Sequence, residues 1–129
     1  MKTNVGLWID QRNAIIVSLT KDEVKTDRIN SNIENDALTD GATNKDSEDD
    51  IRDRRFTKYI NIYYDEVIKF VREAESIFIF GPGDAKNELK KRLEKEIKNR
   101  LIIDIETADN LTDNQIVAKV QKYFKLQKN

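Results

Sequence analysis

The second half of the chain alternates between helix-periodic segments and short, continuously apolar runs, and this alternation limits the fold more narrowly than any other feature. The two runs are "SIFIF" at 76–80 and "LIIDIE" at 101–106. Apolar residues at successive positions over so short a length are typical of a strand that is covered on both faces. Strands separated by helices pair in parallel, and the helices pack against the sheet. The pattern therefore predicts an α/β fold.

Three helices are predicted around these strands, each from apolar residues at spacings of three and four. The first begins near Arg54, the second follows the break at Gly81-Pro82-Gly83, and the third follows a capping-box pattern at Thr112 and Gln115. The apolar positions of the three helices, in order, are Phe56, Ile60, Tyr63, Val67, Phe70, Val71 and Ala74, then Leu89, Leu93 and Ile97, and then Ile116, Val117, Val120, Tyr123 and Phe124.

The first 53 residues have a different pattern. Residues 4–10 and 14–19 are rich in β-formers and flank the polar corner Gln11-Arg12-Asn13, which favours an antiparallel hairpin, and residues 22–29 suit an edge strand. Residues 30–53 carry eight acidic and two basic side chains with few apolar ones. Such a segment buries too little surface to offset the entropy of ordering, so we expect a long mobile loop. The predicted order is β-β-β-(long loop)-α-β-α-β-α.

The composition bounds the function. A length of 129 residues suits one domain spanning 1–129. The chain has no cysteine and no histidine, which excludes disulfides, thiolate nucleophiles and the usual near-neutral proton shuttle. Its 23 basic and 24 acidic residues nearly cancel, so any attraction to nucleic acid must be local. We expect a cytoplasmic protein without membrane contact, since no long apolar stretch is present. We also expect no cofactor and no metal.

One long segment carries a family resemblance. From Arg54 to Leu93, "RRFTKYINIYYDEVIKFVREAESIFIFGPGDAKNELKKRL" combines an Arg-Phe helix start, an amphipathic helix, an apolar strand, a Gly-Pro-Gly turn and a lysine-containing helix. In this order it resembles the middle domain of the archaeo-eukaryotic class-1 peptide release factors and their Pelota-type relatives, including small stand-alone bacterial members. The opening "VGLWIDQRNAIIVSL" resembles the first hairpin of that domain. The resemblance implies a mixed β-sheet flanked by helices, ribonuclease-H-like, and a partner in translation: the ribosome, a tRNA or a translation-associated protein.

The same resemblance implies a catalytic Gly-Gly-Gln tripeptide in the loop before the Arg-Phe helix start, where it positions water on the peptidyl-tRNA ester. The corresponding place here is about Asp49-Asp50-Ile51, and no Gly-Gly-Gln occurs anywhere in the chain. An acidic loop is repelled by ribosomal RNA phosphates. We therefore predict no catalytic residues, and a domain that associates with the translation machinery without hydrolysing peptidyl-tRNA.

Basic side chains gather in two places that could contact RNA phosphates. The candidates are Arg52, Arg54 and Arg55 before the first helix, and Lys86, Lys90, Lys91 and Lys95 in the second. Glutamates interleave with the lysines, so a solvated helix face with i,i+4 ion pairs is the competing interpretation.

The break at Gly81, Pro82 and Gly83 also has two interpretations. Unpaired N–H groups at a helix start attract anions, and Lys86 could assist. The Gly-x-x-x-x-Gly-Lys-Ser/Thr spacing of a phosphate-binding loop is absent, however. Glycines that permit unusual backbone angles, a proline that ends the strand and Asp84 at the helix start explain the stretch as a turn.

Two other functions stay open. Asp10, Asp104 and Glu66 could form a two-metal nuclease site, although Asp10 equally suits a hairpin turn. A protein–protein adaptor that kept the fold without RNA contact could use an exposed aromatic side chain such as Tyr64 or Tyr59. The sequence does not fix the oligomeric state and is compatible with a homo-oligomer.

Overall fold

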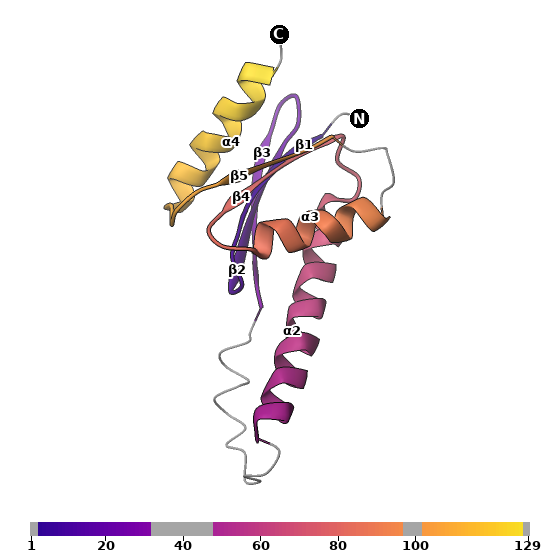
Figure 1. Cartoon of the computed structure of the whole chain (residues 1–129). Coiled ribbons are helices and arrows are strands. Elements are labelled where there is room, and N and C mark those ends of the chain that lie inside the picture. The colour runs from indigo at the N-terminus through magenta and orange to yellow at the C-terminus, as the bar shows by residue number, and fades with distance from the viewer. Residues whose placement is uncertain (1–2, 32–47, 97–101, 128–129) are drawn as a thin grey trace.

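A mixed β-sheet forms the centre of the protein. The computed structural model describes residues 3–31, 48–96 and 102–127, except for the side chains of 48–53, 102 and 126–127 (Figure 1). Within these residues the sheet has five strands in the order β3-β2-β1-β4-β5. The strands are β1 (Asn4–Ile9), β2 (Asn13–Leu19), β3 (Val24–Asn30), β4 (Ser76–Gly81) and β5 (Ile102–Thr107). β2 is antiparallel to β1 and β3, whereas β4 is parallel to β1 and β5.

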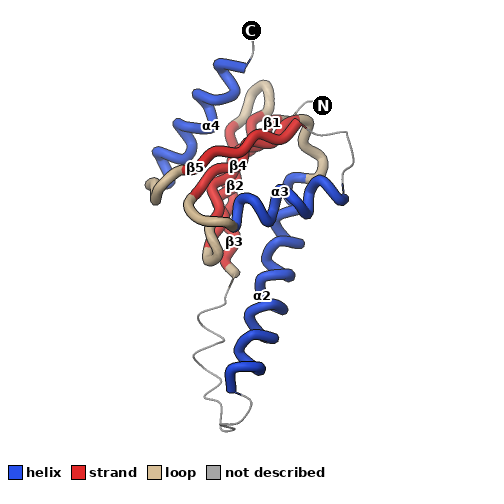
Figure 2. The backbone as a smooth tube through the Cα atoms, viewed as in Figure 1, coloured by secondary structure: helices blue, strands red, loops and turns tan. Residues whose placement is uncertain are grey.

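Helices cover both faces of this sheet. α2 (Glu48–Val71) and α3 (Ala85–Glu96) lie on one face, and α4 (Asp113–Gln127) lies on the other (Figure 2). The predicted α/β class, the mixed sheet and the order of the elements are confirmed.

The two faces of the sheet build two separate cores. Side chains alternate between the faces along β1 and β4, as in any strand. Val5, Leu7, Ile9, Ile77 and Ile79 pack with α2 and α3, while Trp8, Phe78 and Phe80 pack with Ile116, Val120 and Phe124 of α4. This two-sided burial explains why residues 77–80 are apolar at every position. Each such side chain contributes about 1.5–3 kcal/mol by leaving water.

The β1–β2 hairpin turns at the polar corner that the sequence predicts. One carboxylate oxygen of Asp10 accepts hydrogen bonds from the N–H groups of Arg12, at 2.8 Å, and Asn13, at 2.7 Å. An aspartate that bonds the backbone two and three residues ahead holds a tight turn. The turn sets the register, in which Ile9 lies opposite Ala14.

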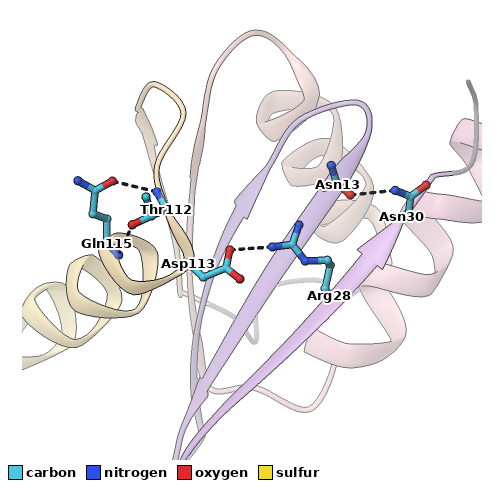
Figure 3. Close-up of polar contacts among 6 residues, drawn as sticks. All are labelled: Asn13, Arg28, Asn30, Thr112, Asp113 and Gln115. Carbon is cyan, nitrogen blue, oxygen red and sulfur yellow. Dashed lines mark hydrogen bonds and ion pairs between the residues drawn. The ribbon is translucent and has the colours of Figure 1, made fainter.

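α4 begins with the predicted capping box and is tied to the far edge of the sheet (Figure 3). The Thr112 N–H donates to Gln115 Oε1 at 2.9 Å, and the Gln115 N–H donates to Thr112 Oγ1 at 3.2 Å, so two unpaired helix donors are satisfied. The first residue of the helix, Asp113, pairs with Arg28 of β3 at 2.7 Å. Asn30 of β3 donates to the Asn13 side chain of β2 at 2.9 Å. The Arg28–Asp113 pair thus ties the start of α4 to β3, while the body of the helix packs on β1, β2 and β4.

The start of α2 corrects one prediction. The helix begins at Glu48 and runs for 24 residues, so the placement of its start near Arg54 was wrong, and residues 48–53 do not belong to a loop. The prediction counted the acidic residues of this segment as a sign of disorder. The helix dipole, however, favours acidic residues in the first turn of a helix. The predicted loop was also placed too early, since β3 extends to Asn30. Residues 32–47 of that loop, and the predicted core residue Ile97, lie outside the described residues.

The buried stripe of α2 differs from the predicted one at two aromatic residues. Phe56 is 38 % exposed and Phe70 is 48 % exposed, whereas Tyr64 and Ile68 are buried. Phe56 follows the periodicity but belongs to the first half of α2, and that half of the helix extends past the sheet (Figure 1). Phe70 lies at the margin of a stripe that is centred on Val67 and Val71.

Gly6 provides a test of how closely α4 packs on the sheet. A Cβ at Gly6 would overlap the side chain of Val120, so we expect Gly6→Ala to lower the free energy of unfolding by about 1–3 kcal/mol. Val120→Ala removes the obstructing methyl groups, so the double variant should lose less stability than the two single losses added together. Urea unfolding followed by circular dichroism measures all three, and strictly additive losses would contradict this packing.

Candidate nucleic-acid interface

The Gly-Pro-Gly break joins β4 to α3, and each of its glycines is required by the backbone. Gly81 and Gly83 both have positive φ angles, of 149° and 65°. A Cβ at Gly81 would also overlap the carbonyl oxygen of Ile9 on the neighbouring strand. The Asp84 carbonyl accepts the N–H groups of Asn87 and Glu88, both at 3.0 Å, and so starts α3. β4 ends at Gly81, directly before Pro82, so the turn interpretation accounts for the proline as well as for both glycines and Asp84.

Lys86 supports this turn from inside the protein. Its side chain is only 6 % exposed, and its Nζ donates a hydrogen bond to the Gly83 carbonyl. It lines an open pocket of about 430 Å³ together with Gly83, Asp84, Asn87, Ile105, Glu106 and Thr107. Two carboxylates therefore share the pocket with one lysine whose ammonium group is already bonded. This arrangement favours the turn interpretation over the binding of an anion, which remains a prediction.

The outer face of α3 carries the lysines that were predicted to contact RNA, and acidic side chains lie among them. Lys91 and Lys95 are exposed and Lys90 is half-buried. A shallow groove of about 500 Å³ runs along this face, lined by Asp84, Asn87, Glu88, Lys90, Lys91 and Glu94. Two lysines thus stand against three carboxylates in the groove. Lys95 lies outside its lining and is the member of the set farthest along the helix.

The arginines at the start of α2 lie apart from α3. Arg54 is exposed and Arg55 is half-buried, on the part of the helix that extends beyond the sheet, while the side chain of Arg52 is outside the described residues (Figure 1). Lys58 is also exposed there. The sequence analysis missed Lys58, although its spacing of four residues from Arg54 places both on one face of the helix and could have revealed it.

Two arginines, Arg92 and Arg72, form contacts between α2 and α3, so their charges are not available to the candidate surface. The guanidinium of Arg92 in α3 lies 4.8 Å from the centre of the Tyr64 ring and donates to Asn61 of α2 at 2.5 Å. Arg72 approaches Glu96 at 3.7 Å. Tyr64 is 1 % exposed, because α3 lies over it, so its proposed use as an exposed aromatic contact was wrong.

The acidic residues considered for a nuclease site are occupied elsewhere. Asp10 accepts the turn amides described above, and Asp104 accepts the hydroxyl of Tyr123. β4 lies between the strands that carry these two residues, and Glu66 is exposed on α2. Within the part of the chain that the structure describes, no group of three His, Cys, Asp or Glu side chains could hold a metal ion. None of the helices described here is long and apolar enough to cross a membrane.

Comparison with known proteins identifies the fold through solved structures. No protein-family model matches the chain, and no curated protein is significantly similar in sequence. The Pelota protein of Thermoplasma acidophilum aligns over 94 % of the chain with a TM-score of 0.61 and 15 % identity. The archaeal translation termination factor aRF1 aligns over 97 % with a TM-score of 0.55, and Archaeoglobus fulgidus Pelota over 98 % with a TM-score of 0.51, each at 14 % identity.

These alignments cover 32 %, 36 % and 35 % of the solved chains, so this chain spans about a third of the length of the proteins it matches. The resemblance to the Pelota and release-factor domain is therefore confirmed as a shared fold.

The two glycines of the turn should differ in their tolerance of a side chain. Gly81→Ala meets both an unfavourable φ and the Ile9 carbonyl, and we expect it to cost about 3 kcal/mol or more of unfolding free energy. Gly83→Ala meets only an unfavourable φ, because no atom lies within 4 Å of its Cβ position, and should cost about 1–2 kcal/mol. Chemical denaturation compares the two, and equal losses would argue against the close approach of β4 to β1.

Tyr64 gives the alkaline stability of the protein a specific component. Burial, with Glu88 adding to it and Arg92 opposing it, raises the pKa of Tyr64 from 10.0 to about 12. The folded protein therefore holds the Tyr64 proton more tightly than the unfolded chain does. The resulting stabilisation is complete below pH 10 and is lost as the pH rises from 10 towards 12. Between pH 10 and 12 the unfolding free energy of wild type should therefore fall more than that of Tyr64→Phe. We expect the two decreases to differ by up to about 2 kcal/mol.

Urea unfolding at pH values between 9 and 11.5 measures the effect in both proteins. Tyr63 and Tyr123, whose pKa values are also raised, keep their contributions in the variant and serve as an internal reference. Parallel stability curves for wild type and Tyr64→Phe would contradict the assignment.

Proposed function

We propose that this chain is a non-hydrolytic, release-factor-like domain that acts in translation in the cytoplasm, by binding the ribosome, a tRNA or a translation-associated protein. The observation that carries the proposal is the extent of the shared fold. The alignments to Pelota and to the termination factor include the N-terminal meander, the parallel strands and helices on both faces, and they cover at least 94 % of the chain. A fold by itself does not determine function, so the binding surface and its test are argued separately below.

Binding without hydrolysis follows from the residues of the chain. The sequence contains no Gly-Gly-Gln, no histidine and no cysteine. The place where the tripeptide would be expected, Asp49 to Ile51, lies inside the first turns of α2 and not in a loop. A helical, acidic segment presents neither the flexible backbone nor the neutral amide that the family uses on the peptidyl-tRNA ester.

The surface that we assign to RNA contains only some of the basic residues of α2 and α3. Lys86, Arg92 and Arg72 bond within the protein. Exposed positive charge is contributed by Arg54 and Lys58 on α2 and by Lys91 and Lys95 on α3, and the half-buried Lys90 adds to the α3 group. Such side chains fit phosphate oxygens, which provide affinity without reading sequence.

A protein–protein adaptor is the second candidate, and the exposed apolar residues of α2 favour it. Phe56, Ile62 and Phe70 are 38 %, 45 % and 48 % exposed. Apolar contact depends weakly on salt, whereas contact with several phosphates weakens steeply as salt rises. The salt response of binding therefore separates the two functions.

Substitution of the α3 lysines tests the RNA surface. We expect the protein to pellet with ribosomes at low salt and the triple variant Lys90→Glu, Lys91→Glu, Lys95→Glu to stay in solution, because three phosphate contacts become repulsive. A single Lys91→Ala should reduce the slope of log affinity against log salt by roughly 0.7–0.9.

The matched control carries Lys21→Glu, Lys25→Glu and Lys122→Glu, three exposed lysines away from α2 and α3 with the same total change of charge. It should bind like wild type, and circular dichroism verifies that both triple variants fold. Unchanged pelleting of the α3 variant would remove this helix as the contact surface. Absence of wild-type binding at low salt would favour the adaptor.

A further inference from the structure

The outer side of α2 carries an apolar surface that nothing within the described residues covers. Ile62 is 45 % exposed and lies nearly opposite the buried stripe of Tyr63, Val67 and Val71. Phe70 is 48 % exposed two turns further on, along one flank of the same side. α3 contacts the other flank through Arg92 and Asn61. The outer side of α2 is therefore open to a partner over most of its length.

The charges around Ile62 are ordered along the helix. Arg54, Arg55 and Lys58 precede it, and Asp65 and Glu66 follow it. Lys69 and Arg72 depart from this order, but Arg72 is paired with Glu96 at 3.7 Å. The side of α2 that faces away from the sheet is thus basic before Ile62 and acidic directly after it.

This order makes the surface complementary to itself. If a second α2 runs antiparallel and the two-fold axis passes near Ile62, the two Ile62 side chains meet at the axis. Helical geometry, at 100° and 1.5 Å per residue, then places Lys58 across from Asp65 of the second copy, and places Asp65 across from its Lys58. On the opposite flank Glu66 lies three residues from the level of Arg55 of the second copy, and Lys69 is level with that arginine. The two Lys58–Asp65 pairs therefore carry the complementarity, one on each side of the Ile62 centre, as in an isologous interface.

We propose that the outer side of α2 pairs with the same surface of a second copy of this chain, forming an antiparallel, two-fold symmetric homodimer. The helix of 24 residues is about 36 Å long. The sheet packs on the side of α2 that carries the buried Tyr63, Val67 and Val71, so the sheets of the two copies lie on opposite outer sides of the helix pair. A single helix pair buries an area at the lower limit of specific interfaces, so the dimer is weak and forms reversibly.

Sedimentation equilibrium of the purified chain, without ribosomes or RNA, tests the pairing independently of the proposed function. Between about 5 and 500 µM we expect the average mass to rise from 15.1 kDa towards twice that value. Ile62→Asp should weaken the dimer by about tenfold or more, since two carboxylates then meet at the axis. Val24→Asp is the matched control, because Val24 lies on β3, outside the proposed contact, and its exposure of 48 % is close to the 45 % of Ile62.

A charge exchange tests the orientation of the two helices. Lys58→Glu and Asp65→Lys should each weaken self-association, since each brings like charges together at both ends of the interface. An equimolar mixture of the two variants restores opposite charges at both ends and should recover the wild-type dimer. Both positions are exposed, so the variants are expected to fold, and circular dichroism verifies this.

A wild-type mass that stays at the monomer value over the whole range overturns the proposal. So does a dimer that Ile62→Asp leaves intact, or one that Val24→Asp weakens equally, because the contact would then lie elsewhere. Failure of the mixed charge variants to associate would exclude the antiparallel pairing.

Discussion

The parallel pairing of β1 with β4 is the contact on which the rest of the structure depends. It joins the antiparallel meander of the first 30 residues to the helix-and-strand half of the chain. The pairing requires close contact at both ends, where the Glu75 N–H donates to the Thr3 carbonyl at 2.9 Å and Gly81 passes against the Ile9 carbonyl. Because β1 and β4 are inner strands of the sheet, each contributes side chains to both cores and so contacts the helices on both faces.

Local signals in the sequence predicted much of this fold. The run at 76–80, the corner at Asp10 and the capping box at Thr112 are determined by neighbours in the chain, and all three are present. The run at 101–106 does form a strand, β5, but its prediction as covered on both faces was wrong, because β5 is an edge strand on which Asp104 and Glu106 are exposed. Features that depend on distant residues were missed. Tyr64 is buried because α3 covers it, Phe56 is exposed because the sheet ends before it, and Lys86 points inward to a carbonyl. None of these follows from spacing, since spacing does not indicate where another element ends.

The charges of the candidate interface could also be predicted only in part from the sequence, because contacts between distant residues decide which of them are exposed. A count of lysines and arginines along α2 and α3 suggests a broad basic surface, but the tertiary structure redistributes those charges. Lys86 holds the turn, Arg92 joins the helices, and Glu88 and Glu94 share the groove with Lys90 and Lys91. The remaining positive charge lies in two smaller groups, one on each helix. Contact with a polyanion would therefore be set by the spacing between the groups as much as by total charge.

The attachment of α2 has a mechanical consequence. Its buried residues lie between Ile60 and Val71, and the Arg92 contacts with Tyr64 and Asn61 clamp it to α3 at the same level. Between Arg54 and Tyr59 no described side chain is fully buried, so this part of the helix projects from the segment that the core holds. A force applied near Arg54 would therefore act as a torque on the segment from Ile60 to Val71, which is held by its buried side chains in the core and by the Arg92 contacts.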